Sequence, residues 1–219
     1  MAKKTLIAKK DEGRKTGDES QFIARVRELA WTGQHAQAID LATQALGKTG
    51  SKSDWQSDLL DLRAESYIAQ GKLDLAAKDA DAMMKIANAE KKPALKVQAL
   101  NRKALVQMRR GELQAAVKSA AAAVKTAKAL RDSGLLAQSL YRLSEAQFRA
   151  GQNEAALETA QKAIPLFQAA GDLSGAGRVY WVLAIAYFNI GNADDSRPAA
   201  RTALELCQQA GDQYGIGNA

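Results

Sequence analysis

Five glycines recur along this chain at a nearly constant spacing. They stand at positions 33, 71, 111, 151 and 191, so that the separations are 38, 40, 40 and 40. Nine positions after each glycine there is an alanine, and five positions after it the residue is always small. A single unit of about 40 residues cannot bury its apolar face alone, so a pattern this regular predicts units that stack on one another in the same way.

The composition favours helices over strands. Apolar residues make up 47% of the chain but aromatic residues only 5%, and much of the apolar share is alanine, which suits closely packed helices. In the third unit apolar residues recur at helical spacing from Leu95 to Val106 and again from Leu113 to Val124, on either side of Gly111. We therefore expect an all-α fold of eleven helical segments, with each glycine in the left-handed conformation that ends a helix.

The pattern also divides the chain. Residues 1–18 mix charges without apolar periodicity, and we expect them to form a mobile tail. The rest, 19–219, is predicted to be a single array. Asp132, Asp172 and Asp212 follow one another at the repeat distance just before expected helices, where a carboxylate can cap free amides. The predicted units span 19–52, 53–92, 93–132, 133–172 and 173–212, followed by a truncated sixth over 213–219.

The last residues repeat the beginning of a unit and then stop within two helical turns. We interpret the chain as a fragment, because a solenoid normally ends in a capping helix with a polar outer face. The alternative is a natural terminus that frays. Either way the layer around Leu204 is expected to expose apolar surface, which predicts self-association through this end or a frayed last helix.

The units resemble tetratricopeptide repeats over residues 20–219. That family has a small residue seven positions before the turn glycine and an aromatic residue four before it, as at Tyr67 and Tyr187. The period of 40 departs from the usual 34, which implies longer helices, and the family's proline near the end of each unit occurs only as Pro93. The resemblance implies a right-handed solenoid of antiparallel helix pairs, with five repeats and the start of a sixth. The small residues are Val26, Ala64, Ala104, Ser144 and Ala184.

In that family the first helix of each unit faces a concave groove. Positions ten, six, three and two before each glycine share one helix face, and aromatic and arginine side chains there are of the types that dominate binding energy at interfaces. The alternative is that Phe148 and Phe188 only pack against the adjacent unit. With the arginines next to the first position, the predicted partner-binding residues are Asn101, Arg102, Met108, Arg109, Tyr141, Arg142, Glu145, Phe148, Arg149, Trp181, Ile185, Phe188 and Asn189.

Charge is concentrated in the third unit. Residues 85–131 hold twelve Lys or Arg and two Glu, a net charge of +10, whereas the whole chain carries +7. This excess predicts attraction to an acidic protein segment, although a solvated helix surface would have the same composition. Nucleic acid is disfavoured as the partner because this stretch has no aromatic residues on which bases could stack.

No catalytic or cofactor-binding pattern survives inspection. Residues 42–49 match a permissive phosphate-loop pattern but occupy packing positions of a helix with no strand before them. Two G-xxx-G-x-G segments, from Gly171 and Gly211, recur at the repeat distance and are expected to be helix junctions, in which Gly175 and Gly177 let helices approach closely. His35 has no ligand cluster, and the single Cys207 fits a reducing compartment. We expect no enzyme activity, no cofactor, no metal and no membrane insertion, in a cytoplasmic protein.

These observations favour a non-catalytic scaffold that holds a segment of a partner protein in its groove. Units of this length with an Ala-Gly-Asp junction, as at 170–172 and 210–212, resemble arrays in bacterial regulatory proteins. The alternative function is therefore a sensory or regulatory segment of a larger bacterial signalling protein, such as a cyclase or transcription regulator. A nucleic-acid adaptor is the least favoured reading.

Overall fold

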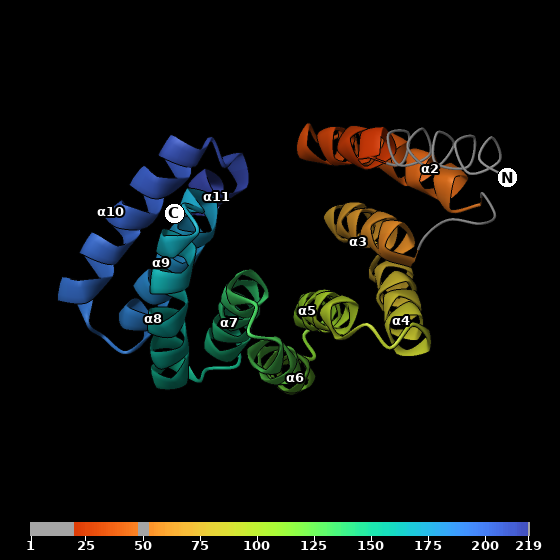
Figure 1. Ribbon diagram of the computed structural model, residues 1–219. Helices are drawn as coiled ribbons and strands as arrows, with labels where there is room; N and C mark the ends of the chain where they lie inside the picture. The colour runs from red at the N-terminus through yellow and green to blue at the C-terminus, as the bar shows by residue number, and fades with distance from the viewer. Residues whose placement is uncertain (1–19, 48–52, 219) are drawn as a thin grey trace, which may run out of the picture. The chain divides into compact units, whose positions relative to one another are not determined.

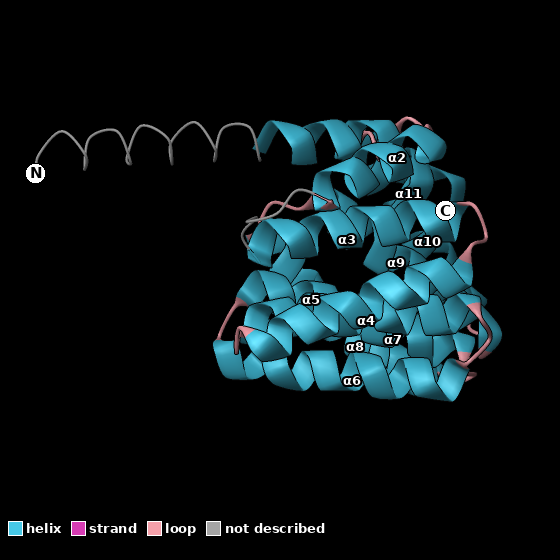
Figure 2. Ribbon diagram, turned by 90° about the vertical axis from the view of Figure 1, so that its right-hand side faces the viewer, coloured by secondary structure: helices cyan, strands magenta, loops and turns pink. Residues whose placement is uncertain are grey.

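The computed structural model describes residues 20–47 and 53–218, and every regular element in these ranges is an α-helix (Figures 1 and 2). This confirms the all-α prediction. The eleven expected helices are found in the described residues, whereas the predicted tail over 1–18 lies outside them. After a first helix over 20–31, the helices are α2 (His35–Leu46), α3 (Ser53–Ala69), α4 (Leu73–Ala89), α5 (Pro93–Arg109), α6 (Leu113–Leu130), α7 (Ser133–Arg149), α8 (Asn153–Ala169), α9 (Leu173–Asn189), α10 (Ala193–Ala210) and α11 (Gln213–Asn218).

The five periodic glycines stand at the turns inside the helix pairs. Their φ angles are +76°, +71°, +77°, +77° and +79° in chain order, which is the left-handed region that costs a residue with a Cβ about 1 to 2 kcal/mol. A Cβ built at any of them would meet no atom within 4 Å. The glycines are therefore required by backbone conformation and not by lack of space, as the sequence predicted.

A second set of turns joins one pair to the next, and here the sequence is less uniform. The residue with positive φ is Lys91 or Arg131 at the first two of these turns, with φ of +53° and +57°. At the next two turns it is Gly171 or Gly211, with φ of +67° and +66°. The same left-handed turn is thus made in two of four places by a residue that is strained there.

Aspartates start three of the helices that follow these turns, as predicted. Asp132 accepts a hydrogen bond from the Leu135 amide of α7 at 2.9 Å, and Asp172 accepts one from the Gly175 amide of α9 at 2.8 Å. Asp212 caps α11 in the same way, through the Gly215 amide at 3.0 Å. Each carboxylate satisfies an amide that the helix itself cannot pair.

Residue contacts divide the chain into two compact units, Met1–Ile86 and Ala87–Ala219. In the first, the helix over 20–31 packs with α2 and α3 around a core that includes Val26, Ala42 and Leu59. Helices α3, α5, α7, α9 and α11 begin at residues 53, 93, 133, 173 and 213, which are the first residues of the predicted units. That all units form one array stays a prediction.

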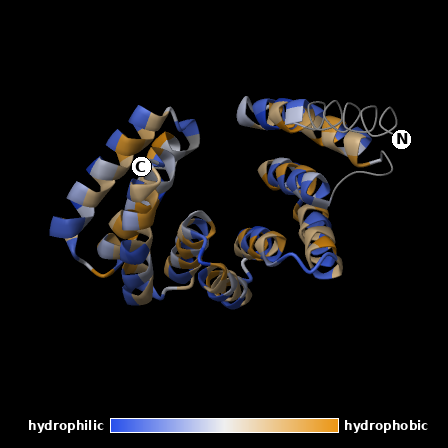
Figure 3. Ribbon diagram, viewed as in Figure 1, coloured by the Kyte–Doolittle hydropathy of each residue, from blue (hydrophilic) through white to orange (hydrophobic). Residues whose placement is uncertain are grey.

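The second unit has two layers. Helices α5, α7 and α9 contact one another in succession, and we call them the inner layer; α6 packs on α5 and α7, α8 packs on α7 and α9, and α10 packs on α9. Figure 1 shows α6, α8 and α10, the outer layer, on the other side of the inner helices. Hydrophobic and hydrophilic residues alternate along these helices (Figure 3), because each buries one stripe between the layers.

Two glycines bring helices unusually close in this unit. A Cβ on Gly175 would lie 2.3 Å from the ring of Phe167, and one on Gly177 would lie 2.6 Å from Sγ of Cys207. The G-xxx-G-x-G segment is therefore a packing junction, as expected from its recurrence. Burial raises the pKa of the Cys207 thiol, so this side chain behaves as a small apolar group.

Two further expectations concern the ends of the described regions. Lys48 and Thr49 of the phosphate-loop-like pattern lie outside the described residues, and the part before them is the C-terminal half of α2.

At the C-terminal end, α11 contacts both α9 and α10, and Leu204 is half-buried. Self-association through this end stays a prediction. None of the described helices is both long and apolar enough to cross a membrane.

Candidate partner-binding face

The predicted binding residues lie on the inner layer, and two aromatic rings join two of its helices. The ring of Phe148 on α7 meets the ring of Trp181 on α9 edge to face, with centroids 5.4 Å apart and planes at 83°. Both rings, and that of Tyr141, pack against the hydrophobic core between α7, α8 and α9. For Phe148 the alternative reading was therefore correct in part, because it packs against the adjacent repeat.

Phe188 holds the same position on α9 that Phe148 holds on α7, yet its environment differs. It is 71% exposed, and Ile190 two residues later is 41% exposed. An exposed phenylalanine at the end of a helix, beside a second exposed apolar residue, is available to a binding partner. Packing against the described part of the chain does not account for its position.

The arginines of α7 are not free charges. Glu145, only 3% exposed, accepts hydrogen bonds from both Arg142 and Arg149, the second at 3.3 Å. Arg142 also lies over the ring of Tyr141, and Arg149 over the ring of Phe148, at 5.2 and 5.3 Å from the ring centroids. Two cations sharing one buried carboxylate leave this cluster a single net positive charge, so its pull on an acidic ligand is weaker than the sequence suggested.

On α5 the predicted residues separate into buried and accessible ones. Met108 is 6% exposed and belongs to a core cluster with Ala116 and Ala146, so it packs between α5, α6 and α7. Its role as a contact residue stays a prediction. Arg109 is exposed and Arg102 half-buried. Asn101 donates to Oγ of Ser139 at 3.1 Å, and its Oδ1 is buried without a hydrogen-bond partner among the described residues.

The remaining predicted residues lie near the end of α9. Ile185 is half-buried and Asn189 is exposed. The Asn189 amide donates to Oδ1 of Asn153 on α8 at 3.1 Å. The structure thus brings Tyr141, Arg142, Glu145, Phe148, Arg149 and Trp181 together in one cluster on the inner layer.

Sequence reasoning missed two ion pairs that join helices. Asp212 is fully buried and accepts from Oγ of Ser174 at 2.5 Å and from Nε of Arg178 at 2.7 Å. Burial alone would raise the pKa of Asp212, but these hydrogen bonds and the Gly215 amide lower it to about 2. In the first unit Arg63 holds the buried Asp79 through two nitrogens, at 2.6 and 2.8 Å. Both pairs join residues of opposite charge that are far apart in the sequence. Such residues are common along the chain, so the sequence does not indicate which of them pair.

In the first unit the charged residues of α3 are mostly acidic. Helix α3 carries Asp54, Asp58, Asp61 and Glu65, and burial together with the nearby Asp61 and Asp54 raises the pKa of Asp58. A pocket in this unit is lined by Gln21, Phe22, Arg25 and Leu41. Neither feature coincides with the residues predicted to bind a partner.

No protein-family model matches the sequence, and no curated protein matches it. Solved structures do. The Rap protein complexed with competence and sporulation factor superposes with a TM-score of 0.78 at 16% identity, over 89% of this chain and 55% of that one. The kinesin light chain TPR-like repeats of Podosopora anserina give 0.65 at 17% identity, over 88% and 95% of the two chains. PlcR of Bacillus thuringiensis, in complex with the peptide PapR7 and DNA, gives 0.70 at 14% identity, over 93% and 75%.

These likenesses are too distant in sequence to transfer a function, but they agree on the architecture. The chain spans about half the length of the Rap protein, so the activity of that whole protein does not follow from the match. The superpositions extend over 88% to 93% of this chain, and one of the matched structures is described as TPR-like repeats. This chain therefore has the fold of the tetratricopeptide-like repeat proteins.

Proposed function

We propose that this chain is a non-catalytic interaction scaffold that binds a segment of a partner protein on the inner face of α7 and α9. The exposed side chain of Phe188 carries the proposal. Burial of an aromatic side chain contributes strongly to the binding free energy of an interface, and aromatic residues near the centre of an interface are typical hot spots. Trp181, seven residues earlier on the same helix, forms a rigid platform with Phe148 and the arginine pair of α7.

The face is pre-organised for binding. Trp181 is fixed against Phe148, and Arg142 and Arg149 are fixed by Glu145, so a partner would order few side chains when it docks. Less ordering means a smaller entropic cost of association. The partner expected here has an apolar anchor for Phe188 and a polar or weakly acidic flank, since the arginine cluster retains one net charge. We place this function in the cytoplasm.

The titratable groups with shifted pKa values support the non-catalytic part of the proposal. Asp212 and Arg63 are both engaged in ion pairs between helices, and Cys207 is buried. The pKa of Asp58 is raised too, by burial and by the nearby Asp61, so each of the four shifts has a local structural cause. None of the four groups lies in the cluster of α7 and α9.

The test is a selection of peptides displayed on phage against the whole chain, followed by affinity measurement for the best binder. Phe188→Ala should weaken that binder about 30-fold, which corresponds to roughly 2 kcal/mol for a hot-spot side chain. Leu173→Ala is the matched control, because Leu173 is an exposed apolar residue at the other end of the same helix. Equal binding by wild type and Phe188→Ala would refute the proposal.

A second function, a sensory or regulatory segment of a larger signalling protein, is favoured by one observation. Two of the structures that this chain resembles were solved with a peptide or a factor bound, and one of them also holds DNA. In that case the same inner face would receive the signal, and another domain would act on it. Recovery of a gene product in which this array is fused to a catalytic or DNA-binding domain would decide in favour of this role.

A further inference from the structure

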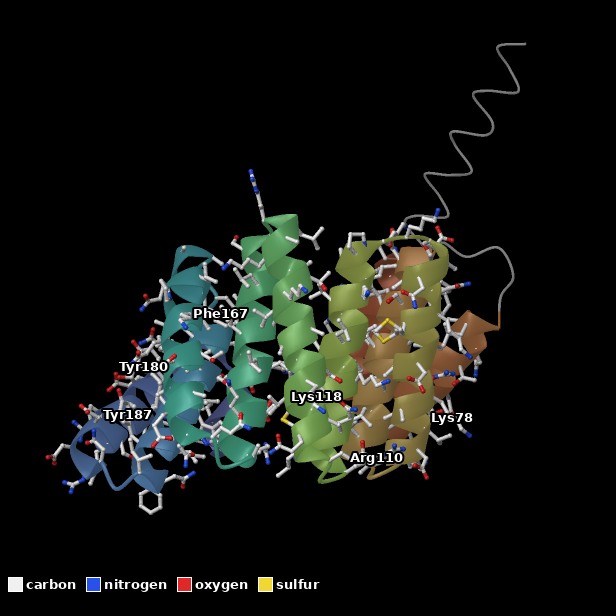
Figure 4. All side chains as sticks on the ribbon, turned by 90° about the horizontal axis from the view of Figure 1, so that it is seen from below. Lys78, Arg110, Lys118, Phe167, Tyr180 and Tyr187 are labelled. Atoms are coloured by element: carbon white, nitrogen blue, oxygen red, sulfur yellow. The ribbon has the colours of Figure 1, made fainter. Side chains whose placement is uncertain are left out.

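The outer face of α6 carries lysines that the described part of the chain leaves without acidic partners. Lys118, Lys125 and Lys128 are all exposed, and none of them makes an ion pair within residues 20–47 and 53–218. Helix α6 itself contains no aspartate or glutamate from Leu113 to Leu130. Figure 4 labels Lys118 on this helix. Three positive charges therefore face solvent from one helix.

Their spacing is regular. Lys118 and Lys125 are two helical turns apart, about 10 Å along the axis at 1.5 Å per residue, and Lys128 lies roughly one further turn along. The exposed residues among and after them are Ala121, Ala122 and Ala129. Such short side chains let the backbone of another helix approach closely, between flanking lysines.

Neighbouring outer helices lack this arrangement. Helix α8 exposes Glu154, Glu158 and Lys162, with Lys162 at 3.9 Å from Glu158. Helix α10 mixes signs as well, with Asp194 and Asp195 in its first turn and Arg201 farther along. A helix surface that only needs to be solvated can carry charges of both signs, as α8 and α10 do. The basic face is thus a property of α6 and not of the outer layer.

We propose that the outer face of α6 is a docking surface for an acidic helix of a partner protein. Carboxylates repeated every seven residues on such a helix would match the spacing of Lys118 and Lys125, and the alanines would accept its close approach. A lipid surface fits less well, because none of the exposed large apolar residues lies on α6 and interfacial helices need them. Nucleic acid fits less well because α6 has no aromatic residue. This surface is on the layer opposite to the inner face, so both can be occupied together.

The probe is a synthetic helical peptide of roughly 20 residues, made of alanine and glutamate with the glutamates on one face, long enough to be helical in water. Binding to the whole chain is followed by fluorescence anisotropy. The variant Lys118→Glu/Lys125→Glu/Lys128→Glu should weaken binding at least about tenfold, because like charges now face each other across the interface.

The matched control is Lys78→Glu/Lys85→Glu/Lys162→Glu. It changes the net charge by the same amount at three exposed lysines on α4 and α8, and it should alter affinity less than about threefold, because charges outside the docking surface act only through screened attraction. The neutral variant Lys118→Gln/Lys125→Gln/Lys128→Gln should give an intermediate loss, and it keeps the test valid if the charge reversal disturbs folding. Circular dichroism checks that each variant is folded.

Three results would overturn the proposal. The first is an equal loss in the α6 variant and the control, which would mean attraction by net charge only. The second is no binding of the peptide by wild type. The third is binding of single-stranded RNA or of vesicles with anionic lipid that depends on the α6 lysines while the acidic peptide does not bind. The site is independent of the inner face, so Phe188→Ala should leave the affinity for this peptide unchanged.

Discussion

The arginines of α7 and the lysines of α6 belong to adjacent helices, but the arginines are paired with a carboxylate and the lysines are exposed. Arg142 and Arg149 are held by the buried Glu145 and stacked on aromatic rings. Lys118 and Lys125 face water on a helix without an acidic residue. A charge that is paired and half-buried contributes to the rigidity of the scaffold, whereas an exposed and unpaired charge costs the fold little and remains available to a partner. Counting basic residues along the sequence cannot separate the two.

The largest effect is expected on the paired side of this comparison. Glu145→Ala leaves Arg142 and Arg149 partly buried without their common carboxylate, so the free energy of unfolding should fall by about 3 kcal/mol. Urea denaturation measures it. The control Glu158→Ala removes a carboxylate whose side chain is 76% exposed, and it should cost less than about 0.5 kcal/mol. Similar small losses in both variants would mean that Glu145 does not organise the arginines.

A second paired charge gives a pH dependence. The pKa of Asp212 is about 2 in the folded chain, below the ordinary value of 3.8. The folded state therefore gains stability from the ionised carboxylate above about pH 4, and loses it as the pH falls toward 2. Asp212→Asn should lower the free energy of unfolding by up to about 2.5 kcal/mol at pH 7, because the two pKa values differ by about 1.8 and each pKa unit corresponds to about 1.4 kcal/mol. Thermal melts between pH 7 and 2.5 should show the difference between variant and wild type shrinking with acid; a constant difference would contradict the assignment.

Strain at the end of α6 offers a gain in stability. Arg131 has a φ of +57°, whereas Gly171 stands at the equivalent turn of the next repeat. Arg131→Gly should raise the free energy of unfolding by about 0.5 to 1 kcal/mol, because glycine adopts this conformation without steric cost. Gly171→Ala should lower it by a similar amount, and chemical denaturation of the two variants side by side measures both. If both substitutions destabilise, Arg131 makes contacts that outweigh its backbone strain.

The smallest effect on stability is expected on the unpaired side. Lys118→Ala and Lys125→Ala should each change the free energy of unfolding by less than about 0.5 kcal/mol, since these side chains are exposed and lack ion pairs within the described residues. Denaturant midpoints at low and high salt provide the measurement. A loss above about 1 kcal/mol in either variant would show that the α6 lysines support the fold.

Periodicity predicted the fold because each repeated position has one physical role. The turn glycines need positive φ, and the aspartates cap helices, so their spacing was enough to place the turns and three helix starts. Lys91 and Arg131 were not predicted to share the left-handed conformation of Gly171, because that conformation is enforced by the neighbouring helices and not by the residue itself.

The candidate site was predicted less well, for a physical reason. Helical spacing places Met108, Phe148 and Phe188 at one position of the repeat, but it does not say what covers them. Met108 is buried against Ala116 and Ala146, the ring of Phe148 packs on the ring of Trp181, and Phe188 is exposed. The same applies to Glu145, since its burial between two arginines depends on their side-chain conformations. The burial and pairing of these side chains depend on residues of the neighbouring helices. The residue pattern on one helix face carries no information about those neighbours.

Site-specific photo-crosslinking tests most directly whether the inner face binds a partner. A photoreactive phenylalanine analogue replaces Phe188, or as control the exposed Gln161 on the outer helix α8, and the protein is irradiated in its source cell. We expect a discrete cross-linked adduct from position 188 that is absent at position 161 and is lost when Trp181→Ala is added. No adduct at 188, or the same adducts from both positions, would contradict the proposal.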